Sequence, residues 1–326
     1  ILIPSVTTAV ETSVLPNSAD LGGDVTSDGG ATVTERGIYY GTSSDPEFSG
    51  TKVVIGSGVG SFSTTVTGLT IDTRYYFVAY ATNSAGTAFG ATLNFTTPAE
   101  TTVADWDGNV YQTVVIGSQT WMAENLRSTH YADGTAIPLV ETPSTWMDLI
   151  DTDKAYCFYN NDDNNAVPYG ALYNWAGAMN GAGSSDAVPS GVQGVCPDGW
   201  HLPSDEEWKQ LAMELGMSRA DADGTLWRGT DEGGKLKETG TTHWESPNSG
   251  ATNESGFNAI PGGSRSIMEA AFMDINRFSR MHCSTEATEI ATTHIWRHAV
   301  GYNETKFQRN YYLKGNGFTV RCLKDK

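Results

Sequence analysis

The sequence predicts two domains, an all-β sandwich followed by a larger α+β domain. Its 326 residues correspond to about two domains of ordinary length. The first part consists of short β-branched runs between turn signals and shows no helical periodicity. The second part combines alternating runs with two stretches whose apolar residues recur at helical spacing. We place the sandwich at residues 1–98, a linker at 99–103 and the second domain at 104–326.

The charge balance narrows the classes of partner. Lys and Arg number 20 against 38 Asp and Glu, which gives a formal net charge of −18. Nucleic acids and anionic membranes are bound by clustered cations, so neither is expected as the main partner. No apolar run reaches the roughly 18–20 residues of a membrane span. The first residues, Ile1–Pro4, lack a starting Met and a charged leader, so we expect a mature chain whose export signal or lipid anchor has been removed.

Four cysteines, at positions 157, 196, 283 and 322, form neither a C-x-x-C pair nor a zinc pattern with His. An even, widely spaced set is typical of two disulfides in an exported protein. The alternative is four unrelated buried thiols in a cytosolic protein. We favour export, and therefore expect the protein to be extracellular, at the cell surface or on a virion.

Five runs in the first domain are predicted to form strands, at residues 33–40, 52–55, 61–66, 75–82 and 92–97. Turn signals such as Ser27–Gly30 lie between them, and short strands at this spacing indicate two packed antiparallel sheets.

One group of residues near the end of this domain consists of Leu69–Tyr75, Val78, Ala79, Asn83 and Gly86. The group resembles the signature of fibronectin type III domains, although Ile71 stands where that family usually has Pro. The resemblance implies that Tyr75 closes a corner by bonding nearby backbone. It implies little about function, because one fold serves many functions.

In the second domain, residues 110–116 and 119–122 are predicted to form a hairpin across Gly117. Residues 169–179 have an apolar helical stripe. A capping box, Ser204 with Glu207, precedes a second stripe that ends near Gly216. A final strand is predicted at 317–323.

Several long motifs recur in order through this domain, at residues 105–111, 116–126, 169–175, 194–208 and 317–322. They closely resemble the Fibrobacter succinogenes major paralogous domain, over about residues 102–326. The resemblance implies a C-type-lectin-like fold in a surface protein, distantly related to formylglycine-generating enzymes. It also implies that Cys196 and Cys322 form the long-range disulfide of such folds, which leaves Cys157 and Cys283 for a second bridge.

The passage from Gly262 to Cys322 departs most from the family. It is rich in Arg, Tyr, Phe, His, Trp and Asn and shows neither helical nor strand periodicity. Rigid aromatic and adaptable polar residues are typical of binding surfaces, so an exposed, irregular binding face is expected here. The candidate ligand-binding residues are Arg277, Phe278, Arg280, His282, His294, Trp296, Arg297, His298, Tyr302, Phe307, Arg309, Tyr311 and Tyr312.

A sharper hypothesis follows from the resemblance. Lectin-like domains with this layout serve as variable proteins of diversity-generating retroelements, in which adenines of a template are randomised. Met281, Trp296, Lys306 and Gln308 would then be unvaried scaffold, whereas the other candidates would vary. The alternative is an ordinary family member whose exposed face has drifted.

Catalytic signatures are absent from the sequence, which contains no G-x-S-x-G or H-E-x-x-H. Cys283 and Cys322 are too far apart in sequence for the paired thiols of a formylglycine-generating enzyme. We expect no catalysis, no metal and no cofactor. We predict an adhesin or receptor-binding protein whose ligand is a protein or glycan on another cell or surface. The alternatives are a carbohydrate-binding module of a polysaccharide-use system and a structural stalk subunit.

Overall fold

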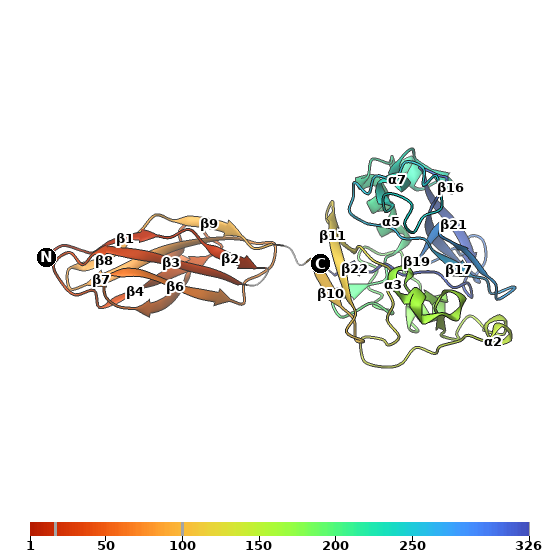
Figure 1. Cartoon of the computed structure of the whole chain (residues 1–326), viewed down its shortest axis with the longest axis horizontal. Coiled ribbons are helices and arrows are strands. Elements are labelled where there is room, and N and C mark those ends of the chain that lie inside the picture. Colours follow the sequence, from red (N-terminus) through yellow and green to blue (C-terminus); the bar gives the residue numbers. More distant parts are fainter. Residues whose placement is uncertain (16–17, 99–100, 326) are drawn as a thin grey trace. The chain divides into compact units, whose positions relative to one another are not determined.

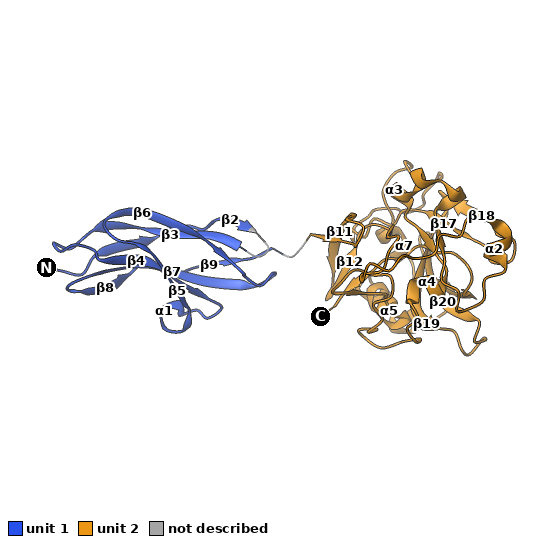
Figure 2. Ribbon diagram, turned by 90° about the horizontal axis from the view of Figure 1, so that it is seen from below, with its two compact units in different colours: residues 1–100 blue, residues 101–326 orange. Residues whose placement is uncertain are grey.

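The computed structural model describes residues 1–15, 18–98 and 101–325. The chain divides into two compact units, Ile1–Glu100 and Thr101–Lys326 (Figure 2). Residues 99 and 100 of the predicted linker lie outside the described residues. None of the helices in the described ranges combines the length and apolarity needed to cross a membrane.

The first unit is a sandwich of two antiparallel sheets (Figure 1). One sheet has the order β1-β3-β2 with β6 beside β3, and the other has the order β5-β4-β7-β8 with β9 beside β7. Buried side chains such as Leu21, Ile38 and Phe77 form the core of this unit. Its elements are β1 (Ser5–Thr8), β2 (Thr12–Leu15), β3 (Ser18–Ser27), β4 (Glu35–Gly41), α1 (Pro46–Ser49), β5 (Thr51–Gly56), β6 (Gly60–Thr67), β7 (Arg74–Asn83), β8 (Gly86–Phe89) and β9 (Leu93–Thr96).

The five strands predicted for this unit are present as β4, β5, β6, β7 and β9. The corner at Tyr75 is present too. Its buried hydroxyl accepts a hydrogen bond of 3.0 Å from the backbone N–H of Thr70, and its ring stacks on Phe95 at 5.8 Å. A tyrosine that ties two strands together in this way is the corner expected of a fibronectin type III-like sandwich.

The second unit contains three sheets and several short helices. The sheets have the orders β10-β11-β12-β22-β15, β13-β14 and β16-β21-β20-β19-β17-β18. The strands are β10 (Thr102–Ala104), β11 (Val110–Ile116), β12 (Gln119–Met122), β13 (Tyr156–Cys157), β14 (Leu172–Tyr173), β15 (Trp200–His201), β16 (Leu226–Arg228), β17 (Gly262–Arg265), β18 (Phe272–Ile275), β19 (Phe278–Glu286), β20 (His294–Gly301), β21 (Phe307–Leu313) and β22 (Leu323–Lys324). The helices are α2 (Pro143–Met147), η1 (Tyr159–Asn161), η2 (Asp163–Asn165), α3 (Ala166–Tyr169), α4 (Trp175–Met179), α5 (Asp205–Glu214), α6 (Arg219–Ala222) and α7 (Glu232–Leu236).

The predicted hairpin is confirmed as β11 and β12, joined at Gly117 with φ 59°. The C-terminal strand pairs with it, but is shorter than predicted: β22 covers only Leu323–Lys324. Residues 317–319 instead form isolated bridges, among them Arg265 with Gly317 and Met281 with Thr319. Successive residues of this segment therefore pair with different strands, so the segment does not form one continuous strand ladder with a single neighbour.

The helix predicted from the capping box is confirmed as α5. The Ser204 hydroxyl accepts from the Glu207 backbone, and the Glu207 carboxylate accepts from the Ser204 N–H at 3.0 Å. The helix predicted at 169–179 is confirmed for α4 and for Tyr169 at the end of α3, but it is wrong at residues 170–174, which are not helical. Gly170 breaks the run with φ 80°, and Asn174 starts α4 by accepting a hydrogen bond from the Gly177 N–H.

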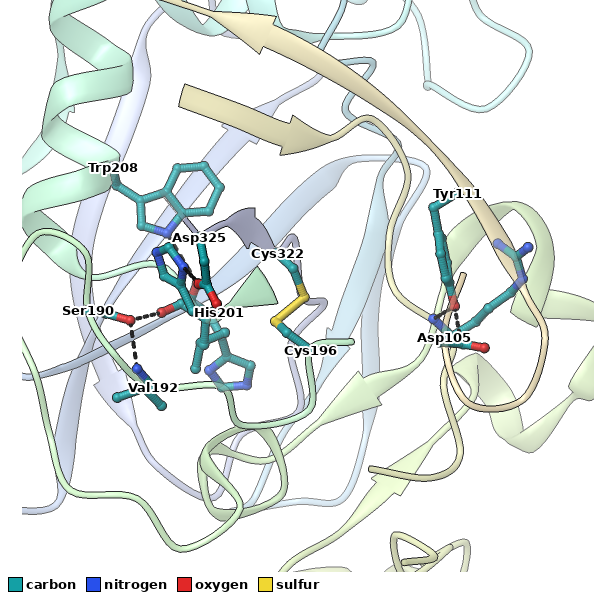
Figure 3. The surroundings of a disulfide bond; sticks show 12 residues. Asp105, Tyr111, Ser190, Val192, Cys196, His201, Trp208, Cys322 and Asp325 are labelled. Carbon is teal, nitrogen blue, oxygen red and sulfur yellow. Dashed lines mark hydrogen bonds and ion pairs between the residues drawn. A yellow bond between two sulfur atoms is a disulfide. The ribbon is translucent and has the colours of Figure 1, made fainter. Parts of the chain in front are cut away.

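The disulfide predicted between Cys196 and Cys322 is confirmed, and it closes a separation of 126 residues (Figure 3). The bridge predicted between Cys157 and Cys283 is wrong, because both are free, buried thiols. Cys157 packs in the cluster around Trp146, whereas Cys283 packs in a different cluster with Trp208. Burial raises the pKa of both thiols, that of Cys157 to about 11, so both are unreactive.

Removing the disulfide with the pair Cys196→Ser and Cys322→Ser is expected to destabilise the second unit by about 4–5 kcal/mol, since the unfolded chain regains a long loop. All 9 Trp lie between residues 106 and 296, so tryptophan fluorescence during urea unfolding reports on this unit alone. Cys157→Ala is the control: it removes a thiol without opening a loop and is expected to cost about 1 kcal/mol. Equal losses in the two variants would contradict the role given to the bridge.

Candidate binding surface

The candidate passage folds into three long strands, β19, β20 and β21, at the centre of the six-stranded sheet. The prediction of an irregular, exposed face is therefore wrong. Nearly every residue of β20 is buried, on both faces of the sheet. A strand that is buried on both faces needs no alternation of apolar and polar residues. The sequence of β20 therefore lacks the period-two pattern from which a strand is predicted.

The strand register divides the candidates between two faces. Arg280 lies opposite Ala299, which lies opposite Gln308. The next row is Met281, His298 and Arg309. Successive side chains point to opposite faces, so these rows face opposite ways. One face we call the helix face, because its buried side chains pack with Trp208 of α5. Its members are Trp296, His298, Phe307, Arg309 and Tyr311. The opposite face we call the outer face, and its members are Phe278, Arg280, His282, Arg297, Gln308 and Tyr312.

On the helix face, four candidates are buried core residues and not parts of a binding surface: Trp296, His298, Phe307 and Arg309. The Trp208 ring stacks on His298 at 5.2 Å and tilts against Phe307 at 6.2 Å. Helices α5 and α7 both contact β20 (Figure 1), so this side of the sheet is covered. Because side chains alternate along a strand, these side chains point toward the helices and are buried, the polar ones included.

A buried charge network joins α5 to the helix face. The Asp205 carboxylate accepts two hydrogen bonds of 2.7 Å from Arg309 and lies 3.0 Å from Nε2 of His298. Lys209 adds an ion pair at 3.1 Å. Burial alone would raise the pKa of the Asp205 carboxyl, but the bonds from His298 and Arg309 outweigh it and hold that pKa well below its usual value. The Asp205 carboxylate is thus paired with the cations of Arg309 and Lys209, and we assign the network a structural role, since it joins α5 to the sheet.

The outer face carries a half-buried cluster that we call the aromatic–arginine patch, made of Trp227, Phe278, Tyr302, Arg277 and Arg280. The Phe278 ring lies 6.3 Å from that of Trp227 and 6.4 Å from that of Tyr302. Arg277 lies over Tyr302 and Arg280 over Phe278, each at 4.8 Å. All five side chains are partly or fully exposed.

The patch is held rigidly in place. Arg277 donates to the Tyr302 hydroxyl at 2.8 Å and pairs with Glu245 at 3.3 Å. Arg280 pairs with Asp274 at 2.5 Å. A Cβ at Gly301 would lie 2.8 Å from the Phe278 ring and 3.1 Å from that of Trp227, so both rings rest on the bare backbone of β20. Such preorganised side chains lose little freedom on binding.

The remaining candidates lie elsewhere. His282 and Arg297 are on the outer face but buried, contrary to the prediction, beneath the rings of Phe318 and Tyr312. His294 and Tyr311 form a separate exposed pair, 5.9 Å apart, at the opposite ends of β20 and β21 from the patch. Tyr312 is half-buried over Arg297 at 4.2 Å.

The sequence analysis missed Trp227 and the ion-pair partner Asp274. Trp227 lies in the three-residue strand β16, and pairs with Gln308 of β21. The available signal was weak, because the run Leu226–Arg228 is short and lies about 35 residues before the candidate passage, between Gly224 and Gly229. Only the sheet brings it beside Phe278.

The fold and the surface define a class: a β-rich protein of two units with a surface cluster of aromatic and arginine side chains. Over the described ranges, no group of three or more His, Cys, Asp or Glu is arranged to hold a metal ion. The sequence model of the Fibrobacter succinogenes major domain matches residues 114–324. The chain belongs to this family.

No curated protein matches the sequence. Among solved structures, the chain is similar to the sensor domain of the anti-sigma factor RsgI4 of Pseudobacteroides cellulosolvens, with 18% identity, 31% of this chain and 99% of that chain covered, and a TM-score of 0.25. It is also similar to the sixth fibronectin type III domain of a human fibronectin type III domain containing protein 3, with 24% identity, 30% and 84% covered, and a TM-score of 0.22. Similarities this remote say nothing about the ligand of this chain.

The buried histidines give a prediction for pH. Burial lowers the pKa of His282 to about 4 and that of His298 to about 3, although Asp205 opposes the shift at His298. Both imidazoles should therefore be neutral at pH 5.5 in the folded protein, as read by 15N NMR of the ring nitrogens. Unfolding lets them take up protons below their ordinary pKa of about 6.5, so their contribution to the free energy of unfolding falls as the pH drops from 6.5 toward 4.

His201 serves as the internal control. Burial would lower its pKa, but hydrogen bonds with Glu207 and Asp325 outweigh burial and raise it. Its imidazole should stay charged at a pH where His282 and His298 are neutral. A charged His282 or His298 at pH 5.5 would contradict the packing described for the sheet.

Proposed function

We propose that this chain is an exported ligand-binding protein that acts without catalysis, and that the aromatic–arginine patch binds a protein or glycan on another cell or surface. The observation that carries the proposal is the gathering of Trp227, Phe278, Tyr302 and two arginines on one partly exposed surface. Trp, Tyr and Arg dominate the energetics of binding surfaces, since they bury much area at a small cost in side-chain freedom.

Two features support an extracellular location at the cell surface or on a virion. The Cys196–Cys322 disulfide is of the kind that persists in oxidising surroundings. The first unit is a fibronectin type III-like sandwich, a module frequent in cell-surface proteins.

A purely structural stalk is the weaker candidate. A stalk has no use for exposed aromatic rings held rigid by ion pairs, since exposed apolar surface favours association. A carbohydrate-binding module remains within the proposal, since a glycan is one of its two ligand classes.

We propose further that the second unit has a C-type-lectin-like fold, the framework of retroelement-diversified variable proteins. Burial limits which positions tolerate such variation: randomising His298, Phe307 or Arg309 would disrupt the core. The tolerant positions are the exposed ones of the patch and of the His294–Tyr311 pair. Sequencing the coding locus tests the idea, because diversification requires an adenine-rich near-copy and a reverse transcriptase nearby.

The patch is tested by the variants Trp227→Ala and Phe278→Ala in the full chain. Each is expected to weaken capture of ligands from a surface proteome and a glycan array by about tenfold or more, since each removes a central ring. The matched control is Trp106→Ala, which removes another Trp of the second unit that is 60% exposed. Capture that survives both patch variants, or falls equally with Trp106→Ala, would refute the binding role of the patch.

A further inference from the structure

We propose that the outer face contains a subsite for the charged group of an acidic saccharide, formed by Arg297 and His282 beside the aromatic–arginine patch. This inference rests on the proposed binding function and names the chemistry of the ligand.

Arg297 is 1% exposed, and its guanidinium makes only part of its possible hydrogen bonds. Its Nη2 donates to Gln308 Oε1 at 2.8 Å. Its Nε and Nη1 are buried and have no partner among the residues that the structure describes. Three N–H donors are thus left without an acceptor.

Other buried arginines of this unit leave fewer donors unpaired, and at Arg228 the unpaired atom is Nε alone. Arg265 donates to the backbone oxygens of Val140, Glu141 and Ala270. Arg321 donates to Asn125 and to the backbone oxygens of Met122, Phe257 and Asn258. Both are fully buried, as Arg297 is. Leaving buried donors unpaired costs free energy, so the larger number of unpaired donors at Arg297 indicates a group still to be bound.

The local charge is positive in a chain whose net charge is −18. Arg280 and Arg297 lie close enough to interact, and the nearby carboxylate of Asp274 is already paired with Arg280. Burial, with Arg280 adding to it, lowers the pKa of Arg297, whereas Tyr312 and Asp274 oppose the shift. An anion placed at Arg297 would restore the balance of charge.

His282 lies directly opposite Arg297 on the neighbouring strand, on the same face. Its Nε2 donates to the backbone oxygen of Tyr173 at 2.7 Å. Its Nδ1 is buried and without a partner in the described ranges of the chain. Because burial keeps this imidazole neutral at pH 7, Nδ1 is an acceptor that requires a donor.

The two residues together select the chemistry of the ligand. Arg297 requires an anionic acceptor, and His282 requires an O–H or N–H donor close to that acceptor. The acidic side chain of a peptide supplies the acceptor alone, so the donor would have to come from another group of the peptide. A sugar ring that carries a carboxylate or a sulfate next to free hydroxyls supplies both, so an acidic saccharide fits better than an acidic peptide.

The outer face also determines how a ligand would reach Arg297 and where a longer saccharide would continue. The half-buried ring of Tyr312, 4.2 Å from the guanidinium, has to turn aside for a ligand to reach Arg297. In the adjacent row, Gln308 lies between Ala299 and Trp227. The half-buried Trp227 ring is thereby placed where the next sugar of a chain can stack.

The test is calorimetric binding of the full chain to four polysaccharides. Polygalacturonate carries carboxylates and dextran sulfate carries sulfates, whereas methyl-esterified polygalacturonate and dextran are their neutral counterparts. We expect binding to at least one charged polymer, about tenfold or more tighter than to its neutral counterpart. The polymer that binds identifies the anionic group.

Gln308→Glu is the decisive variant. It places a carboxylate where Gln308 Oε1 already accepts from Arg297, so it should satisfy the guanidinium within the chain, leave the fold intact and weaken charged-polymer binding about tenfold or more. Gln210→Glu on α5 adds the same charge on the helix side and should leave binding unchanged. Arg297→Lys, checked for folding by near-ultraviolet circular dichroism, should also weaken binding.

The outcomes separate the two proposals. Failure of both charged polymers to bind, or unchanged binding in Gln308→Glu, would overturn the subsite and leave Arg297 and His282 bridged by buried water only. If ligands captured from the proteome or glycan array still depend on Trp227 and Phe278, the patch keeps its function without the subsite. If ligand binding depends neither on Trp227 and Phe278 nor on Arg297, the proposed function is overturned as well.

Discussion

The Asp205 carboxylate forms an ion pair with Arg309 and a hydrogen bond with His298, and these contacts connect helix α5 to the large sheet of the second unit. Asp205 begins the helix whose capping box the sequence displays, and Trp208 one turn later stacks on His298. The helix start, the ion pair and the aromatic stack therefore position one another. A buried pair of this kind contributes more to the uniqueness of the packing than to net stability, because desolvation offsets much of its Coulomb energy.

The same three strands serve two purposes because their side chains alternate. One row faces α5 and builds the core, and the next row faces outward and presents Arg280 and Gln308. Rigidity of the outer face is a consequence of this sharing, since the patch rests on strands whose other face is fully packed. The disulfide from Cys196 to Cys322 adds a covalent link between the segment before α5 and the C-terminal segment (Figure 3).

Arginine has three different uses in this unit. Arg309 neutralises a buried carboxylate, Arg321 satisfies backbone oxygens, and Arg277 and Arg280 lie over exposed rings. Arg297 also lies against an aromatic ring, that of Tyr312, but it is buried and its Nε and Nη1 have no partner in the described ranges, which is why we infer a ligand there. Composition alone treats all of them as one signal of a binding surface, and the structure shows that burial and partners decide between scaffold and site.

The sequence by itself determined the family, the hairpin at 110–122, the start of α5, the corner at Tyr75 and the Cys196–Cys322 bridge, because each depends on local spacing or on an ordered motif. Only the tertiary structure decided which candidates are exposed. His298 and Arg297 are adjacent in the chain, yet one completes the core and the other lies on the outer face. Trp227 reaches the site through pairing of β16 with β21, which no local pattern records. Register between distant strands arises from packing of the whole sheet, and that is why it could not be predicted from the residues in order.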